Sequence, residues 1–181
     1  KGNRFREHVT VHRGTREGTA TEIGNDNYLM AHCHVAHNCR IGNHTIIVNA
    51  VLLGGYVEVE DRAFLGGGAV VHQFCRVGTL AMLRGLSRIS KDVPPYCMAV
   101  ENNELVGLNA VGLKRTGFST EQRSRLKEAY ATLFLSGLNT SQALESLAKG
   151  PSTAEIHHLT EFIRRSKRGT CAARKKPTDL G

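Results

Sequence analysis

The sequence predicts a mainly β fold, a parallel β-helix built from hexapeptide repeats and followed by a small α-helical domain. From Ile23 to Ile89 every sixth residue is aliphatic, and the residue two positions earlier is nearly always small. Residues i and i−2 of a strand point to the same face, so both rows should point inward. Short strands at this period indicate coils with three edges and about 18 residues each. A β-sandwich is disfavoured, because its strands are not spaced at a constant six residues.

Each row consists of one kind of side chain. The aliphatic row contains Ile23, Leu29, Val35, Ile41, Ile47, Leu53, Val59, Leu65, Val71, Val77, Leu83 and Ile89. The small row contains Thr21, Asn27, Cys33, Cys39, Thr45, Val51, Val57, Ala63, Ala69, Cys75, Ala81 and Ser87. Residues that suit left-handed or turn conformations follow the aliphatic row and are expected at the corners: Gly24, Gly42, Gly54, Gly66, Gly78, Asn25, Asn43 and Asn49.

The elements follow in order along the chain. Residues 1–11 form a coil fragment, and a loop over 12–22 interrupts the repeats. The chain opens in mid-coil without a start methionine, so N-terminal coils are expected before Lys1. Pro94 and Pro95 close the solenoid, because proline cannot donate to a further ladder. The predicted domains are the β-helix over 1–96, a helical domain over 97–169 and a flexible basic tail over 170–181.

Four helices are expected after the solenoid. The first covers 103–115, and the second begins at a capping box formed by Ser119 and Gln122 and runs to about Ser136. The third begins at Thr140 or Ser141 and ends near Gly150. The last runs from Ser152 to about Lys167, with an apolar stripe facing a core.

Composition limits the function classes. The formal net charge is +8, concentrated late in the chain, which favours an acidic partner. Nucleic acid is disfavoured, because no aromatic residues are interleaved for base stacking and no recognition motif occurs. No run of 18 apolar residues or signal-type segment is present, so no transmembrane segment is expected. Five cysteines without a Cys-x-x-Cys pair favour reduced thiols and a cytoplasmic protein. The basic clusters are Arg115, Arg123, Arg125 and Lys127, and Arg164, Arg165, Lys167, Arg168, Arg174, Lys175 and Lys176.

One corner of the predicted coil collects polar side chains. Segments 34–38, 52–56 and 70–74 should stack, because residue n lies under residue n+18. Histidines beside glycines there indicate a general base close to backbone N–H groups that could hold an oxyanion. Histidine suits this role because its pKa lies near neutrality. The corner contains His34, His37, Asn38, Gly54, Gly55, Tyr56, His72 and Gln73.

Zinc is the rival use of these histidines, as in a zinc-dependent β-helix enzyme of the gamma carbonic anhydrase type. His32 and His37 have a His-x₄-His spacing, but a third ligand must project to the same point. His72 lies two coils from His37, about 10 Å away, and cannot join them within one chain. No metal site and no cofactor are therefore predicted.

Several segments together resemble the UDP-N-acetylglucosamine O-acyltransferase family, whose members start lipid A biosynthesis. The similarity runs from about Arg4 to Gly169. The segments are Leu29-Met30, His34-Val35-Ala36-His37-Asn38-Cys39, Val71-His72-Gln73-Phe74-Cys75, Asp92-Val93-Pro94-Pro95-Tyr96, Gly112-Leu113-Lys114-Arg115, His12-Arg13-Gly14-Thr15 and Ser166-Lys167-Arg168-Gly169.

The resemblance implies a left-handed coil and a homotrimer with active sites between subunits. It implies transfer of an R-3-hydroxyacyl chain from acyl carrier protein to the 3-hydroxyl of UDP-N-acetylglucosamine. Part of the nucleotide-sugar site is expected on the absent N-terminal coils. The basic surface then has a partner, because acyl carrier protein is acidic.

The resemblance also implies roles for individual residues. His37 matches the general base, and the N–H of Gly55 matches the oxyanion donor. His34, His72 and Gln73 match substrate and donor contacts. Polar contacts at the C-terminal domain and the acyl-chain length position correspond to Asn109, Arg115 and Gly85.

The sequence departs from the family in four places. Asn38 replaces the usual aspartate; it can accept a bond from the imidazole but adds no charge, so a lower turnover is expected. Tyr56 replaces a histidine, and Val111 and Thr116 replace polar or charged residues. The acceptor therefore stays open between a sugar hydroxyl and a 3-amino analogue. A related hexapeptide N-acyltransferase acting on an amino sugar, or a non-catalytic trimeric scaffold, are the alternatives.

Overall fold

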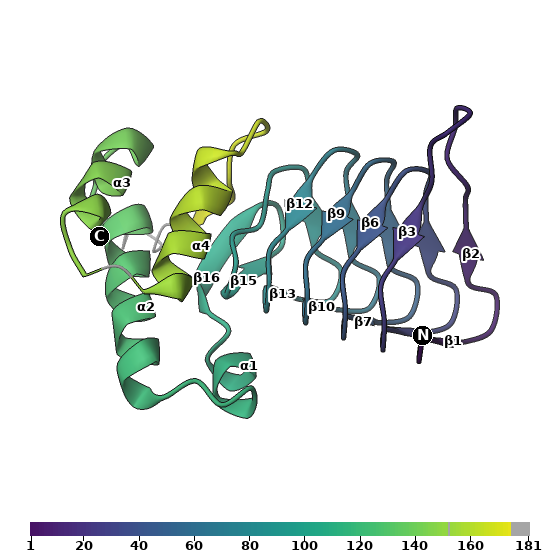
Figure 1. Cartoon of the computed structure of the whole chain (residues 1–181), viewed down its shortest axis with the longest axis horizontal. Coiled ribbons are helices and arrows are strands. Elements are labelled where there is room, and N and C mark those ends of the chain that lie inside the picture. The colour runs from purple at the N-terminus through teal and green to yellow at the C-terminus, as the bar shows by residue number, and fades with distance from the viewer. Residues whose placement is uncertain (152, 175–181) are drawn as a thin grey trace, which may run out of the picture.

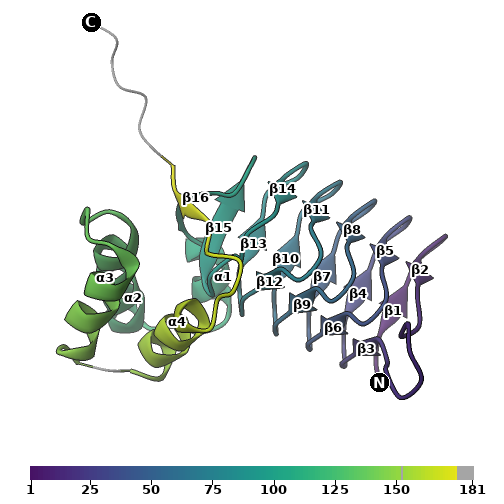
Figure 2. The same cartoon turned by 90° about the horizontal axis from the view of Figure 1, so that it is seen from above.

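A computed structural model describes residues 1–151 and 153–174. Figure 1 shows a solenoid of short strands that contains the N-terminus at one end, with helices packed at the other end. Seen from above, the strands form rows along the solenoid, one row for each face of the coil (Figure 2). The predicted parallel β-helix followed by helices is confirmed.

The strands form three sheets, and all strands of the coil pair in parallel. Sheet A contains, in order, β1 (Arg4–Phe5), β4 (Tyr28–Leu29), β7 (Ile46–Ile47), β10 (Phe64–Leu65), β13 (Met82–Leu83), β15 (Cys97–Val100), β16 (Glu104–Leu108) and β17 (Ala172–Ala173). Sheet B contains β2 (Thr10–Val11), β5 (His34–Val35), β8 (Leu52–Leu53), β11 (Val70–Val71) and β14 (Arg88–Ile89). Sheet C contains β3 (Glu22–Ile23), β6 (Arg40–Ile41), β9 (Glu58–Val59) and β12 (Arg76–Val77).

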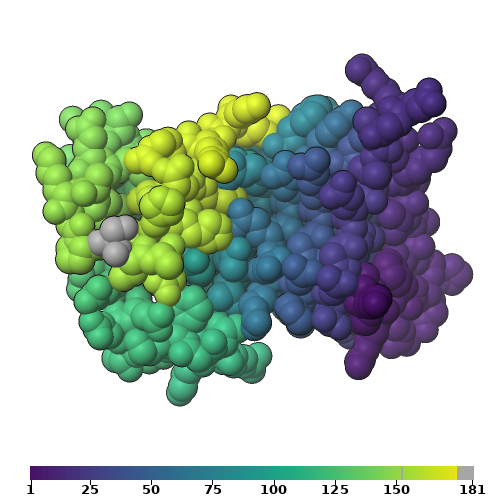
Figure 3. All heavy atoms as spheres, in the orientation of Figure 1, coloured from purple at the N-terminus to yellow at the C-terminus, as the bar shows by residue number. Residues whose placement is uncertain are grey.

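The register confirms the predicted coil length and locates its one interruption. Ile47 pairs with Leu65, an offset of 18 residues (65 − 47). In the first coil Phe5 pairs with Leu29, an offset of 24 (29 − 5). The six extra residues lie in the loop between β2 and β3, which projects beyond the outline of the solenoid (Figures 1 and 3).

Both predicted rows point inward and form the core. From Leu29 to Ile89 every member of the aliphatic row is at most 4% exposed. The small row is buried from Asn27 to Ser87, and its polar members are hydrogen-bonded: the Thr45 hydroxyl donates to the Asn27 side-chain oxygen and the Ser87 hydroxyl donates to the Arg84 carbonyl, each at 2.7 Å. Small side chains fit here because three faces converge on a narrow interior.

The glycines after the aliphatic row do not supply the left-handed conformation, which corrects the prediction. The left-handed residue comes two positions later, as at Asn38 with φ 61° and Tyr56 with φ 59°. The glycines are needed because the next coil is close: a Cβ at Gly54 would lie 2.7 Å from the Gln73 backbone nitrogen. The asparagines bond between coils instead, and the Asn43 side-chain oxygen accepts from the Asn25 N–H at 2.8 Å.

Sheet A continues past the predicted boundary at residue 96. β15 pairs in parallel with β13, and β16 returns antiparallel to β15. The helix expected over 103–115 is therefore wrong for 104–108, and only α1 (Ala110–Arg115) is helical. The open edge of β15 explains the difference, because its unpaired N–H and C=O groups favour a further strand.

The remaining helices agree with the prediction. They are α2 (Thr120–Phe134), α3 (Thr140–Ala148) and α4 (Ala154–Arg164). The capping box of Ser119 and Gln122 is present, and α3 begins at Thr140, as predicted, with Asn139 as its N-cap. Helix α4 ends at Arg164, before the expected Lys167, and the expected start at Ser152 lies outside the described residues.

One basic side chain docks the helices on the solenoid. The Arg76 guanidinium lies 3.8 Å from the centre of the Phe162 ring and donates to the Phe162 carbonyl at 2.9 Å. Its other side faces the buried Asp92 carboxylate at 3.9 Å. These contacts attach α4 to sheet C.

The tail predicted over 170–181 begins as part of the sheet. β17 pairs in parallel with β16, and Arg174 forms ion pairs with Glu101 and Glu104, each at 3.3 Å. Residues 175–181, which include Lys175 and Lys176, lie outside the described residues. Among the described residues no helix has the length and apolar character needed to cross a membrane.

Candidate active site

His37 lies at the corner between sheets B and C, where residues 36–39, 54–57 and 72–75 stack; we call this the His37 corner. The His37 Nδ1 atom is 3.0 Å from the Asn38 side-chain oxygen. The left-handed backbone at Asn38 turns its side chain back toward the ring of the preceding residue. A ring whose Nδ1–H is engaged in this way keeps the Nε2 lone pair for accepting a proton.

Gly55 lies against the His37 ring in the next coil, as the 18-residue stacking predicts. A Cβ at Gly55 would lie 2.5 Å from His37 Cε1 and 2.8 Å from His37 Nε2. Only glycine therefore fits beside the imidazole. No acceptor among the described residues bonds the Gly55 N–H, although the neighbouring Tyr56 N–H donates to the His37 carbonyl at 3.0 Å.

The loop over 12–22 completes this corner. A cavity of about 540 Å³ is lined by Val11, His12, Arg13, Gly14, Thr15 and His37. The Thr15 N–H and hydroxyl both donate to the Asn38 side-chain oxygen, at 3.2 and 3.1 Å. The role of Thr15 was not predicted. The interrupted period was the available signal, because an offset of 24 residues places residues 12–14 over 36–38, directly before Thr15.

His34, His72 and Gln73 lie around the same corner. His34 Nδ1 is 2.8 Å from the Thr10 hydroxyl, and its ring packs edge-on against His12 with centres 4.6 Å apart. Burial, and then repulsion from His12, lower the pKa of His34, which favours the neutral ring. His72 and Gln73 are exposed, one coil beyond Gly55.

Asn109 and Arg115 lie elsewhere. They line a cavity of about 500 Å³, here called the α1 cavity, between α1, the outer side of sheet A and the corner between sheets C and A. The Asn109 amide caps α1 through Gly112 and donates to the Leu80 carbonyl at 2.9 Å, so a structural role accounts for it. Arg115 shares the cavity with Arg62 and His44, and this group of basic side chains suits phosphate.

Gly85 lies at the third corner, between sheets A and B. A Cβ there would lie 3.2 Å from the Gly67 carbonyl oxygen, so the stacked glycines leave a strip without side chains. The predicted site residues therefore divide among all three corners of the coil. One chain does not bring His37, Arg115 and Gly85 together.

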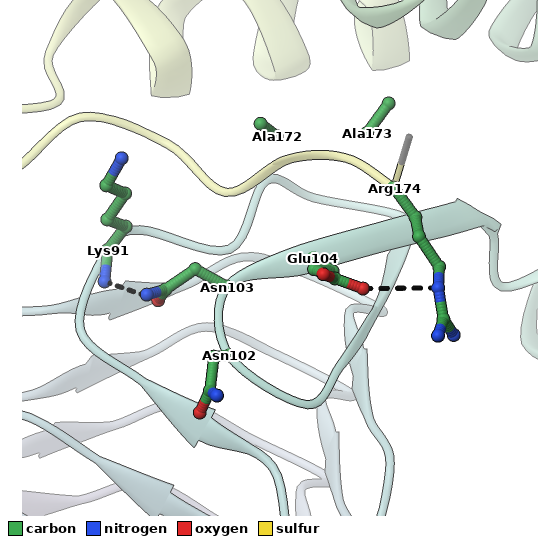
Figure 4. Close-up of a pocket in the computed structure, with 7 residues that line it drawn as sticks. All are labelled: Lys91, Asn102, Asn103, Glu104, Ala172, Ala173 and Arg174. Atoms are coloured by element: carbon green, nitrogen blue, oxygen red, sulfur yellow. Dashed lines mark hydrogen bonds and ion pairs between the residues drawn. The ribbon is translucent and has the colours of Figure 1, made fainter. Parts of the chain in front are cut away.

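A groove of about 550 Å³ lies at the junction of β16 and β17, where Lys91 continues the His37 corner one coil beyond Gln73. Figure 4 shows that Lys91 and Asn103 come from one side and Arg174 from the other, with Arg174 paired to Glu104. Arg174 forms an ion pair with Glu104, the Lys91 backbone N–H donates to the Asn103 side-chain oxygen at 3.0 Å, and no histidine or cysteine lines the groove. This groove is the seam that holds the C-terminal strand.

The residues proposed for zinc are also separated. His32 stacks on His8 with ring centres 5.0 Å apart, at the corner between sheets A and B, away from His37. Within the part of the chain that the structure describes, no three His, Cys, Asp or Glu residues are grouped as a metal site.

Comparison with known proteins identifies relatives over most of the chain. Residues 92–171 match a family model described as domain 2 of UDP-N-acetylglucosamine O-acyltransferase, and residues 20–55 match the bacterial transferase hexapeptide model. A Synechocystis protein named acyl-[acyl-carrier-protein]–UDP-N-acetylglucosamine O-acyltransferase is 44% identical over 165 residues, which cover 91% of this chain and 60% of that protein.

Solved structures give the same result. The UDP-N-acetylglucosamine acyltransferase of Arabidopsis has a TM-score of 0.90 and 37% identity, covering 94% of this chain and 63% of its own. The Acinetobacter baumannii enzyme LpxA has a TM-score of 0.87 and 37% identity, covering 95% and 69%. The chain thus spans about three fifths of the length of the curated relatives that it matches.

Proposed function

The chain belongs to the UDP-N-acetylglucosamine O-acyltransferase family, and from this premise we propose that it transfers an R-3-hydroxyacyl chain from acyl carrier protein to the 3-hydroxyl of UDP-N-acetylglucosamine. The observation that carries the proposal is the His37 ring, hydrogen-bonded to Asn38 at Nδ1 and packed on the backbone of Gly55. This pairing puts a base and a free N–H donor side by side.

The reaction needs one proton acceptor and one oxyanion donor. His37 Nε2 takes the proton from the sugar hydroxyl as its oxygen attacks the thioester carbonyl. The Gly55 N–H stabilises the negative oxygen of the tetrahedral adduct. The adduct then collapses, the C–S bond breaks, and the departing thiolate takes the proton from the imidazolium. The residues involved need no cofactor for this sequence.

A homotrimer would unite the separated residues. His37 and Arg115 lie at different corners of one coil, so a second copy could present its α1 cavity to the His37 corner. Arg62, Arg115 and His44 would then bind the diphosphate of the nucleotide sugar. His34, His72 and Gln73 would contact the sugar and the acyl donor, and Gly85 would leave room for the acyl chain.

Helix α2 supplies a surface for the donor protein. Arg123 and Lys127 border an apolar cavity of about 410 Å³ between α1, α2 and β16. Basic side chains around an apolar centre suit an acidic partner such as acyl carrier protein. The five free cysteines are all buried, which is consistent with the reducing cytoplasm.

The test is an assay of the full-length protein with 3-hydroxyacyl carrier protein and UDP-N-acetylglucosamine. We expect ester formation, and we expect His37→Ala to reduce its rate by about 10²- to 10⁴-fold. His32→Ala is the matched control, because it removes a histidine at another corner and should keep the activity.

Other results would redirect the assignment. Unchanged turnover in His37→Ala would remove this residue as the base. Transfer only to a 3-amino sugar would identify an N-acyltransferase, and loss of activity with a chelator would favour zinc. Normal folding and assembly without turnover on any acceptor would leave a scaffold.

A further inference from the structure

The Asn38 side chain connects the His37 ring to a loop that lies outside the repeat. Its oxygen accepts from the Thr15 N–H at 3.2 Å and from the Thr15 hydroxyl at 3.1 Å, and it is 3.0 Å from His37 Nδ1. Its backbone N–H donates to the Thr21 hydroxyl at 2.8 Å. Two threonines of the same loop therefore hold Asn38 in place.

The Thr15 N–H and hydroxyl together decide which end of the Asn38 amide faces the ring. A side-chain amide has an oxygen that accepts and an NH₂ group that donates, and it could rotate to present either one. A backbone N–H can only donate, so the amide atom that meets Thr15 must be the oxygen. An amide turned the other way would place two donors against each other.

This orientation sets the protonation of the imidazole. The same oxygen lies within hydrogen-bond distance of His37 Nδ1, so that nitrogen must carry the hydrogen. Nε2 then keeps its lone pair on the edge of the ring that packs on Gly55. We propose that Thr15 is a positioning residue that selects the Nδ1–H tautomer of His37 by fixing the Asn38 amide.

The proposal accounts for a threonine hydroxyl directed at an asparagine. A carboxylate at position 38 would present an acceptor in either orientation, so it would select the same tautomer without help. Asparagine needs an outside donor to choose its orientation. The catalytic meaning rests on the proposed function, but the tautomer itself can be measured without turnover.

The test is ¹⁵N NMR of the histidine rings in the full-length protein, with the His37 signals assigned by their loss in His37→Gln. We expect a protonated Nδ1 and a bare Nε2 in the wild type and in Thr15→Ser, which keeps the hydroxyl. Thr15→Val has the same shape without the hydroxyl donor. Because only the N–H donor then remains, the preference for this amide orientation weakens, so the Nε2–H population should rise and kcat should fall by about three- to tenfold with KM unchanged.

A second background separates a tautomer effect from loss of structure. In Asn38→Asp the Thr15→Val change should leave the tautomer on Nδ1–H and lower kcat by less than twofold. An Nε2–H tautomer in the wild type, or an unchanged tautomer ratio in Thr15→Val, would overturn the proposal. A protein without acyl transfer but with the expected NMR result would refute the proposed function and leave this inference intact.

Discussion

The outward residues of sheet A are apolar and those of sheet C are charged, although the inward residues of both sheets are alike. In sheet A the residues in register from β4 to β15 are apolar: Tyr28, Ile46, Phe64, Met82 and Met98. In sheet C they alternate in charge: Glu22, Arg40, Glu58 and Arg76. The coil is stabilised by its inward rows, so the outward residues are free to suit the surroundings of each face. Their chemistry therefore indicates what each face contacts.

The contrast favours sheet A as the face that would contact a second copy in the proposed homotrimer. Ile46 is 37% exposed, and Leu52 and Val70 on sheet B are 44% and 39% exposed, at adjoining faces of the coil. A continuous apolar patch on a folded chain indicates an interaction surface, whereas alternating charges suit solvent. The proposed homotrimer would bury sheets A and B and leave Glu22, Arg40 and Glu58 of sheet C exposed.

The largest expected effect, on assembly and activity, comes from exchanging the outward residues of two strands that follow each other in the chain, Arg40 of β6 and Ile46 of β7. Ile46→Arg should abolish the trimer and its activity, because an unpaired guanidinium buried in the contact costs on the order of 3–5 kcal/mol. The reciprocal Arg40→Ile on sheet C should leave both unchanged. Light scattering with the acyltransfer assay measures the two variants, and a trimeric Ile46→Arg protein would place the interface elsewhere.

Substitution of an inward aliphatic residue by alanine should lower the free energy of unfolding by a similar amount on any face of the coil. Leu65→Ala removes a fully buried side chain of sheet A and should lower the free energy of unfolding by about 2–5 kcal/mol. Glu58→Ala, at an outward position of sheet C, should change it by less than about 0.5 kcal/mol. Urea unfolding compares them. Equal losses would show that the outward charges of sheet C also stabilise the coil.

Glu60, a charged residue directly after β9, contacts the helices through His158 of α4. A substitution of Glu60 has the smallest expected effect of the three, and it concerns stability as a function of pH. The Glu60 carboxylate bonds the Thr79 hydroxyl at 2.9 Å and His158 at 3.0 Å. Burial would raise the pKa of Glu60, but the bonds and charge of His158 and the bonds from Thr79 together lower it. A carboxylate whose pKa is lowered in the folded protein stabilises the fold at pH values above the pKa of the unfolded state. This stabilisation is lost as the pH falls through the pKa of the folded state.

The wild type should therefore lose stability relative to Glu60→Gln below about pH 4.5, where free glutamate takes up a proton. The difference should be on the order of 0.2–1 kcal/mol, because the pair is partly exposed. Thermal unfolding of both proteins across that pH range measures it. A difference that does not change with pH would mean that the Glu60 carboxylate adds no stability through its charge.

The coil was predicted well from the sequence because each position of the hexapeptide repeat has a fixed place in the coil. Inward rows, corners and the 18-residue offset follow from spacing alone, and that offset placed Gly55 beside His37. The sequence predicted the hairpin of β15 and β16 poorly. Leu105 and Leu108 have a spacing that also suits a helix, and only the free edge of β15 decides for a strand.

The repeat by itself determined the solenoid, its core and the pairing of His37 with Gly55, because periodic stacking converts sequence distance into spatial distance. Only the tertiary structure decided which groups lie on the Nδ1 side of the His37 imidazole, namely Asn38 and the loop residue Thr15 that bonds it. The loop over 12–22 adds six residues outside the period, so its contact with Asn38 depends on how it folds over the corner. The separation of His37 from the α1 cavity likewise depends on which corner each residue reaches.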